Sequence, residues 1–189
     1  MCIRDRGITD KAAALTAYTT AKTGASTVTL TSDGAWSVSA ANLTTALAAG
    51  VRFAGTLTVT AIANGDETAA LTAFTKTTTG ATTVTLTATD TNWSVTGAAL
   101  TTALADGVFL LGTLSVTDIA NGNETTALTA FTNALTGATS ITLAASDTNW
   151  SVTGTALTTA LGKGMFLAGT LSVTGIASDD ETAAPVSYT

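Results

Sequence analysis

Three tryptophans with nearly identical neighbours are the residues of this sequence best suited to contacting a ligand. Trp36, Trp93 and Trp150 recur every 57 residues, within GAWSVSAANLTTAL, TNWSVTGAALTTAL and TNWSVTGTALTTAL. Exposed aromatic rings can stack on sugar rings, whereas buried ones supply large apolar contacts. A valine follows each tryptophan at the second position, on the same side of a short strand. This pattern favours core packing between repeats, and an exposed row that binds carbohydrate is the alternative.

Threonine rows form a second candidate surface. The threonines that lead these rows are Thr27, Thr29, Thr83, Thr85 and Thr142. They alternate with apolar residues, the period of a strand with one buried face. If neighbouring strands stack in register, the hydroxyls and methyls form a flat ladder. Such Thr-x-Thr arrays resemble those of β-solenoid ice-binding proteins, and the resemblance implies ice or another flat surface as ligand. The preferred interpretation is a solvated strand face, which suits a polar β-branched residue.

Acids and amides gather at the expected turns and are candidates for binding calcium. One junction holds Asp66, Glu67, Asp118, Asn123, Glu124, Asp179, Asp180 and Glu181, and the other holds Asp33, Asp90, Asn92, Asp147 and Asn149. Calcium takes six to eight converging oxygens, and one or two acids per turn fall short of that number. Helix caps and solvated turns are the preferred explanation, calcium between repeats is the alternative, and no other cofactor is expected.

Catalysis and nucleic-acid binding are disfavoured by what the sequence lacks. There is no histidine, the one cysteine is Cys2, and no glycine-rich phosphate loop stands in a suitable context. Met1 to Arg6 resembles a translated adapter from sequencing-library preparation, which we interpret as an artefact. Without it, five basic residues face twelve acidic ones, so no basic stripe is available for phosphates. No run reaches the ~18 to 20 apolar residues of a membrane helix.

The positions of capping residues and glycines within each 57-residue unit predict two helices and two strands. Asp66, Asn123 and Asp180 are expected to cap the start of one helix, which ends at Gly24, Gly80 and Gly137 in the three units. A strand follows this helix, and then a turn and the tryptophan segment. Ser39, Thr96 and Thr153 are expected to cap the second helix, which ends at Gly50, Gly107 and Gly164. The second strand includes 57–60, 114–117 and 171–174.

This order predicts an α/β repeat solenoid with two strand-helix half-units per repeat and a mainly parallel sheet. The alternative is a mixed sheet, with a β-hairpin between 83–88 and 93–96 in each repeat. The expected divisions are an artefact at 1–6, repeat 1 at 7–65 without its first strand, repeat 2 at 66–122, repeat 3 at 123–179, and the start of a diverged or truncated repeat at 180–189. Stacked units bury one another's apolar faces.

The functional prediction rests on the amino-acid composition. Threonine makes up roughly a quarter of the chain, well above ordinary globular usage. Only 11% of residues are charged. This balance resembles that of large secreted bacterial surface proteins, and the resemblance implies an extracellular or cell-surface location. We therefore expect a non-catalytic structural or adhesive segment of a larger protein, with neighbouring repeats as partners. A module that binds carbohydrate or a flat surface is the alternative.

Overall fold

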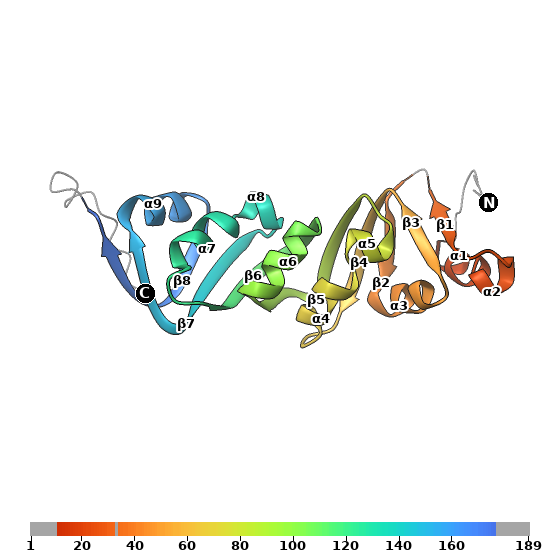
Figure 1. Ribbon diagram of the computed structural model, residues 1–189, viewed down its shortest axis with the longest axis horizontal. Coiled ribbons are helices and arrows are strands. Elements are labelled where there is room, and N and C mark those ends of the chain that lie inside the picture. Colours follow the sequence, from red (N-terminus) through yellow and green to blue (C-terminus); the bar gives the residue numbers. More distant parts are fainter. Residues whose placement is uncertain (1–10, 33, 177–189) are drawn as a thin grey trace.

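The computed structural model describes residues 11–32 and 34–176 as short helices alternating with parallel strands (Figure 1). The helices are α1 Lys11–Ala17, α2 Thr20–Thr23, α3 Ala40–Ala48, α4 Glu67–Ala73, α5 Lys76–Thr79, α6 Gly97–Ala105, α7 Glu124–Ala130, α8 Asn133–Thr136 and α9 Gly154–Gly162. The strands are β1 Val28–Thr31, β2 Trp36–Ser39, β3 Val51–Ala54, β4 Thr56–Ile62, β5 Thr83–Thr96, β6 Val108–Ile119, β7 Ser140–Thr153 and β8 Met165–Thr174. These elements follow one another along the long axis of the molecule.

The sheet pairing is parallel throughout the described residues. Six strands form one sheet in the order β2-β4-β5-β6-β7-β8, and β1 pairs with β3 in a separate two-stranded sheet. The predicted α/β class and mainly parallel sheet are confirmed. The alternative of a hairpin between 83–88 and 93–96 is wrong, because both segments belong to the single strand β5 and run in the same direction.

Strands β5 and β6 each take part in two successive groups of four strands. The first group consists of β2, β4 and the first halves of β5 and β6. The second group consists of the second halves of β5 and β6 and the first halves of β7 and β8. The second halves of β7 and β8 pair with each other. The chain therefore passes from one group to the next inside its strands, and each of these groups draws two strands from each of two 57-residue periods.

A bend in β5 redirects the strand from the first group to the second. Thr87 pairs with Leu111 and Asn92 pairs with Thr113, so four residues of β5 lie opposite Gly112 alone. Thr91, within this bend, has φ 61°, and Gly112 has φ 126°. Gly112 has no side chain, which lets the backbone of the bend approach β6 closely. The bend was expected as a turn between two strands, and it acts as an irregularity within one.

The buried apolar residues of the strands and helices form one continuous core cluster. In β5, Val84 and Leu86 are buried, while the alternating Thr83, Thr85 and Thr87 are partly exposed. Helix α6 adds Leu100 and Ala103 to this core, and α3 and α9 contribute the equivalent leucine and alanine. Alternate residues of the strands and helix residues at helical spacing thus point into the same core and pack together.

The helix expected to run up to Gly80 is in fact two helices. Phe74 leaves the helical conformation, at φ −114° and ψ 56°, and its ring is buried. Thr75 then starts α5 with a capping box, in which Thr75 and Thr78 satisfy each other's backbone N–H groups. Gly80 ends α5 with φ 78°, as predicted. Burial of the Phe74 ring accompanies the interruption of the helix.

The five predicted helix starts that lie within the described residues are confirmed, although one of the two capping mechanisms is not. Ser39, Thr96 and Thr153 each accept a hydrogen bond from a backbone N–H in the first turn, at 3.3 to 3.4 Å. Asp66 and Asn123 precede α4 and α7 but make no side-chain cap hydrogen bond. At α4, the Glu67 carboxylate accepts from the backbone N–H of Gly65 at 2.6 Å instead. The third expected cap of this type, Asp180, lies outside the described residues.

Sequence reasoning missed one strand in each period. Strand β3 and the first halves of β6 and β8 follow α3, α6 and α9, and they alternate buried and more exposed residues over most of their length. We expected two strands in each unit besides the tryptophan segment, and none at 51–54, 108–111 or 165–168. The first halves of β6 and β8 are the fourth members of the two four-strand groups, and β3 pairs with β1 in the two-stranded sheet.

Candidate functional site

The three tryptophans lie in the core at the seams between successive strand groups. Trp36, Trp93 and Trp150 are at most 2% exposed. The indole N–H of Trp93 donates to the carbonyl of Leu111 at 3.1 Å, and that of Trp150 donates to the equivalent carbonyl of Ala168 at 2.9 Å. Each of these indoles thus bonds to the backbone just before the glycine at the middle of the neighbouring strand.

Burial of the tryptophans confirms the core-packing interpretation and corrects the alternative of an exposed aromatic row. Trp36 packs edge-on against Phe53, with ring centroids 5.3 Å apart. A sugar stacks on an aromatic ring only where a ring face is open to solvent. With their rings enclosed by core residues, the tryptophans offer no such platform to a carbohydrate.

Hydroxyl side chains from adjacent strands form in-register rows on the outer face of each four-strand group. In the first group, Ser37 pairs with Thr58, Thr58 with Thr85, and Thr85 with Phe109. A parallel row from Thr56 to Thr83 lies two residues earlier. All of these side chains are partly or fully exposed. The structure therefore brings Thr83 and Thr85 beside threonines of β4, at the ~4.8 Å spacing of neighbouring strands.

The predicted threonines do not join into one ladder. Thr85 belongs to the first group, whereas Thr142 belongs to the second, in the row Ser94-Ser115-Thr142-Phe166. Thr29 pairs with Arg52 in the two-stranded sheet, and Thr27 immediately precedes β1. The rows through Thr29, Thr85 and Thr142 thus end at Arg52, Phe109 and Phe166, and the bend within the long strands separates one row from the next. The result is a series of short hydroxyl faces, each with its own edge.

The turn acids are held by hydrogen-bond donors. Asp90 accepts from the backbone N–H of Asn92 at 3.0 Å and from the side-chain amide of Asn64 at 2.9 Å. The Asn92 N–H is the main cause that keeps the pKa of Asp90 below its ordinary value of 3.8, with partial desolvation opposing it and Asn64 assisting. Asp147 repeats the arrangement with Asn149 and Asn121. These contacts connect the bend in β5 to the turn after β4, and the bend in β7 to the turn after β6.

Calcium would require several oxygens to converge at these turns, and the neighbours of Asp90 instead direct N–H groups at it. Over residues 11–32 and 34–176, no group of three or more histidine, cysteine, aspartate or glutamate side chains is placed to hold a metal ion. The Asn64–Asp90 contact was not foreseen. Its signal was the recurrence of an asparagine and an aspartate 26 residues apart, at Asn64 and Asp90 and again at Asn121 and Asp147.

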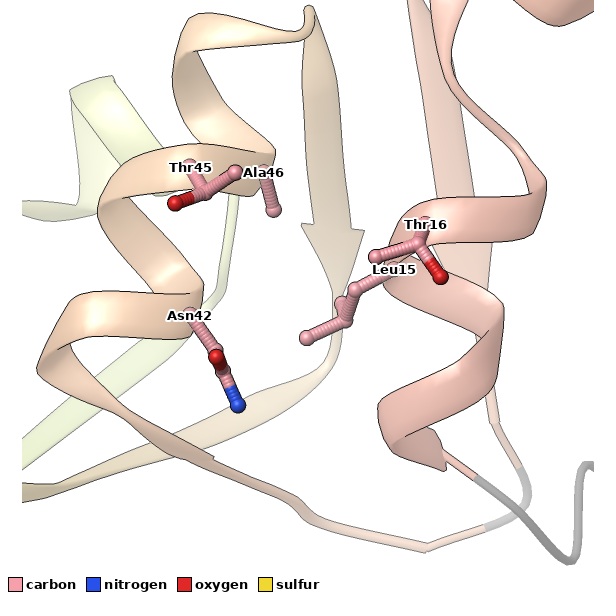
Figure 2. Close-up of a pocket in the computed structure, with 5 residues that line it drawn as sticks. All are labelled: Leu15, Thr16, Asn42, Thr45 and Ala46. Carbon is pink, nitrogen blue, oxygen red and sulfur yellow. The ribbon is translucent and has the colours of Figure 1, made fainter.

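A small cavity lies between α1 and α3. Its volume is about 90 Å³, and it is lined by Leu15, Thr16, Asn42, Thr45 and Ala46. Figure 2 shows Leu15 reaching from one helix toward the space between the two, with Asn42 on the opposite helix. The lining carries no titratable side chain, and the volume is below the ~300 Å³ at which ligand pockets usually begin. This cavity is a packing defect between two short helices.

Comparisons with known proteins give no relative for this chain. No protein-family model, curated protein or solved structure matches it. None of the helices in the described part of the chain is long and apolar enough to span a membrane. The features that bear on function are therefore the shared strands and the recurring hydroxyl faces.

Proposed function

We propose that this chain is a non-catalytic structural or adhesive segment of a larger extracellular bacterial protein. The single observation behind this proposal is that β5 and β6 each contribute to two successive strand groups. Each further repeat in a chain built this way would lengthen the molecule along one axis and add another hydroxyl face of the same kind. The finer architecture that we propose is an α/β solenoid, in which further 57-residue repeats extend the same pattern.

The hydroxyl faces support an adhesive contribution to this role. Each four-strand group presents a row of serine and threonine that ends at a phenylalanine, with Thr85 beside Phe109 in one group and Thr142 beside Phe166 in the next. A face that recurs along a stiff chain binds through many weak contacts at once, so avidity grows with the number of repeats. The extracellular location is part of the proposal and is supported by the threonine-rich, weakly charged composition.

The spacer role is tested by adding residues 66–122 once and twice after residue 122 and measuring the maximum dimension by small-angle X-ray scattering. We expect equal increments in length and an unchanged cross-section. A matched control inserts 57 residues of glycine and serine at the same place, which adds flexibility without a fixed increment. A cross-section that grows with each added repeat would contradict the proposal. The location is tested by labelling intact source cells with antibodies against this chain.

A ligand-binding module is the second candidate, and the in-register hydroxyl rows are the observation that favours it. Its ligand would be a carbohydrate or a flat surface such as ice, contacted by the row through Thr58 and Thr85. The test replaces both residues by lysine, which keeps a solvated face but removes its regularity. Loss of glycan binding or of ice-growth inhibition in this variant, together with unchanged extension by scattering, would support a binding module. Absence of both activities in the unmodified chain would rule this second role out.

A further inference from the structure

Two asparagine-glycine pairs occupy equivalent turns of the molecule, Asn64-Gly65 after β4 and Asn121-Gly122 after β6. The chain has seven asparagines, and only these two precede glycine. A backbone nitrogen can attack the side-chain amide of the asparagine before it, and glycine has no side chain to hinder this attack. The two turns are therefore the places in the chain where an asparagine is most open to loss of its amide.

Both pairs lie at the centre of tight turns that are open to solvent. In each turn a backbone hydrogen bond of 3.0 Å joins the residue after the glycine to the residue before the asparagine. Gly65 and Gly122 have φ 93° and 87°, a conformation that favours glycine. All four residues of the two pairs are exposed, so water reaches the side-chain amides.

The groups around Asn64 hold the reacting atoms in place. The Glu67 carboxylate accepts from the backbone N–H of Gly65 at 2.6 Å, although the Glu67 side chain is only 7% exposed. A general base must lie within hydrogen-bond reach of the proton that it takes, and this carboxylate meets that condition. The Nδ2 group of Asn64 donates to Asp90 at 2.9 Å, which restricts rotation of the amide.

The second turn repeats the same set of residues. Asn121 donates from Nδ2 to Asp147 at 2.8 Å. Glu124 follows Gly122 by two residues, as Glu67 follows Gly65, and it is also 7% exposed. An asparagine-glycine turn with one carboxylate at the amide and a buried one after the glycine is thus a recurring unit of the fold.

We propose that Asn64 and Asn121 are sites of self-catalysed deamidation in the folded chain. At the first site, the Gly65 nitrogen forms a bond to Cγ of Asn64 while Glu67 takes its proton. The Cγ–Nδ2 bond then breaks, and Nδ2 leaves as ammonia with the transferred proton. Water opens the resulting cyclic imide at either carbonyl and leaves aspartate or isoaspartate. Water is the only co-reactant, and the reaction does not depend on the role proposed above.

Deamidation at Asn64 reverses the contact between the turn after β4 and the bend in β5. The amide of Asn64 donates a hydrogen bond to Asp90, whereas the product presents a second carboxylate to it. An attractive contact is replaced by repulsion between like charges. The modification therefore weakens the connection between this turn and the bend.

The first test incubates the full chain at neutral pH and maps its peptides by mass spectrometry. Digestion with pepsin in acid limits further deamidation during the mapping, and electron-transfer fragmentation distinguishes isoaspartate from aspartate. We expect Asn64 and Asn121 to convert at least about tenfold faster than the other five asparagines, because only glycine leaves its nitrogen unhindered. Equal rates at all seven asparagines, or no conversion at these two, would overturn the proposal.

The second test separates the base from the local sequence. Glu67→Gln keeps an oxygen that can accept the Gly65 N–H but removes the basic carboxylate. We expect conversion of Asn64 to slow about tenfold or more, while Asn121 in the same molecules keeps its rate. In urea, where Glu67 is no longer positioned, variant and unmodified chain should react equally fast. An unchanged rate at Asn64, equal slowing at both asparagines, or the same slowing in urea would overturn catalysis by Glu67. Circular dichroism verifies the fold of the variant.

The third test addresses the consequence for the bend. Asn64→Asp mimics the aspartate product, and Asn64→Ala removes the donor without adding a charge. We expect NMR titration to give a higher pKa for Asp90 in Asn64→Asp than in Asn64→Ala, because the like charge adds to the loss of the hydrogen bond. An Asp90 pKa no higher in Asn64→Asp would contradict the repulsion between the turn and the bend.

Discussion

Gly112 of β6 lies directly against the carbonyl oxygen of Thr91, at the bend where β5 passes from one strand group to the next. A Cβ atom added to Gly112 would overlap that oxygen. Gly169 and Thr148 repeat the relationship one period later. The absence of a side chain at this position therefore permits the bend that connects successive groups.

Replacing Gly112 by alanine should lower the free energy of unfolding by about 2–4 kcal/mol, because the overlap adds to the strain of a positive φ. Gly55 provides a matched control one period earlier: its φ is 92°, but nothing lies within 4 Å of an added Cβ. Gly55→Ala should cost only about 1 kcal/mol. Urea denaturation measures both variants, and equal losses would show that the Thr91 carbonyl does not restrict this position.

Replacing Ala61 by glycine should stabilise the protein by about 0.5–1 kcal/mol, because alanine at φ 56° carries strain that glycine avoids. The chain itself has Gly175 at the equivalent position, with φ 65°. Ala69→Gly, at an exposed position within α4, is the control and should destabilise by about 0.5–1 kcal/mol. Thermal unfolding distinguishes the two, and loss of stability in both variants would contradict the strain at Ala61.

Tryptophan emission should report burial of all three indoles. We expect a blue-shifted maximum, weak quenching by acrylamide compared with free tryptophan amide, and no change on adding oligosaccharides. Trp93→Phe should also destabilise the fold by about 1–3 kcal/mol, because the Leu111 carbonyl loses its indole donor. An emission shift that saturates with added sugar would contradict the enclosed position of the rings.

The carboxyl group of Asp90 should titrate below the ordinary pKa of 3.8 when followed by NMR. Because the folded-state pKa is the lower one, the unfolded chain binds more protons in this window. The stabilising contribution of Asp90 is therefore present above about pH 4 and is lost as pH falls through the folded-state pKa. Asn64→Ala should move the titration part of the way toward 3.8, since the Asn92 N–H remains the larger cause. Titration of Asp90 at or above 3.8 in the unmodified chain would contradict these contacts.

Sequence periodicity predicted the individual elements better than their partners. Alternation located the strands around Val84 and Leu114, and hydroxyl caps located the helices after Thr96 and Thr153, because these signals are local. Pairing between Thr58 and Thr85 is a long-range relationship that no local pattern specifies. The bend at Thr91 was interpreted as a turn because its polar residues suit either structure.

The sequence predicted which residues form the hydroxyl rows but not how far each row extends. Thr83 and Thr85 do lie in a hydroxyl row, since alternating residues share one side of a strand. The interruption of the rows depends on the bend and on the strands that begin at Val108 and Met165, which were not foreseen. For the tryptophans, the same alternation with valine that favoured burial is what places them in the core.

The sharing of strands between groups also bears on how the gene for such a chain can change. Each complete group joins two strands from one 57-residue period to two from the next, through the equivalent contacts Leu57–Val84 and Leu114–Ile141. If recombination between neighbouring copies deleted 57 codons in frame, half of one group would meet the matching half of another, and a complete group would re-form. The length of the molecule can thus vary between descendants of one gene while the fold is inherited unchanged.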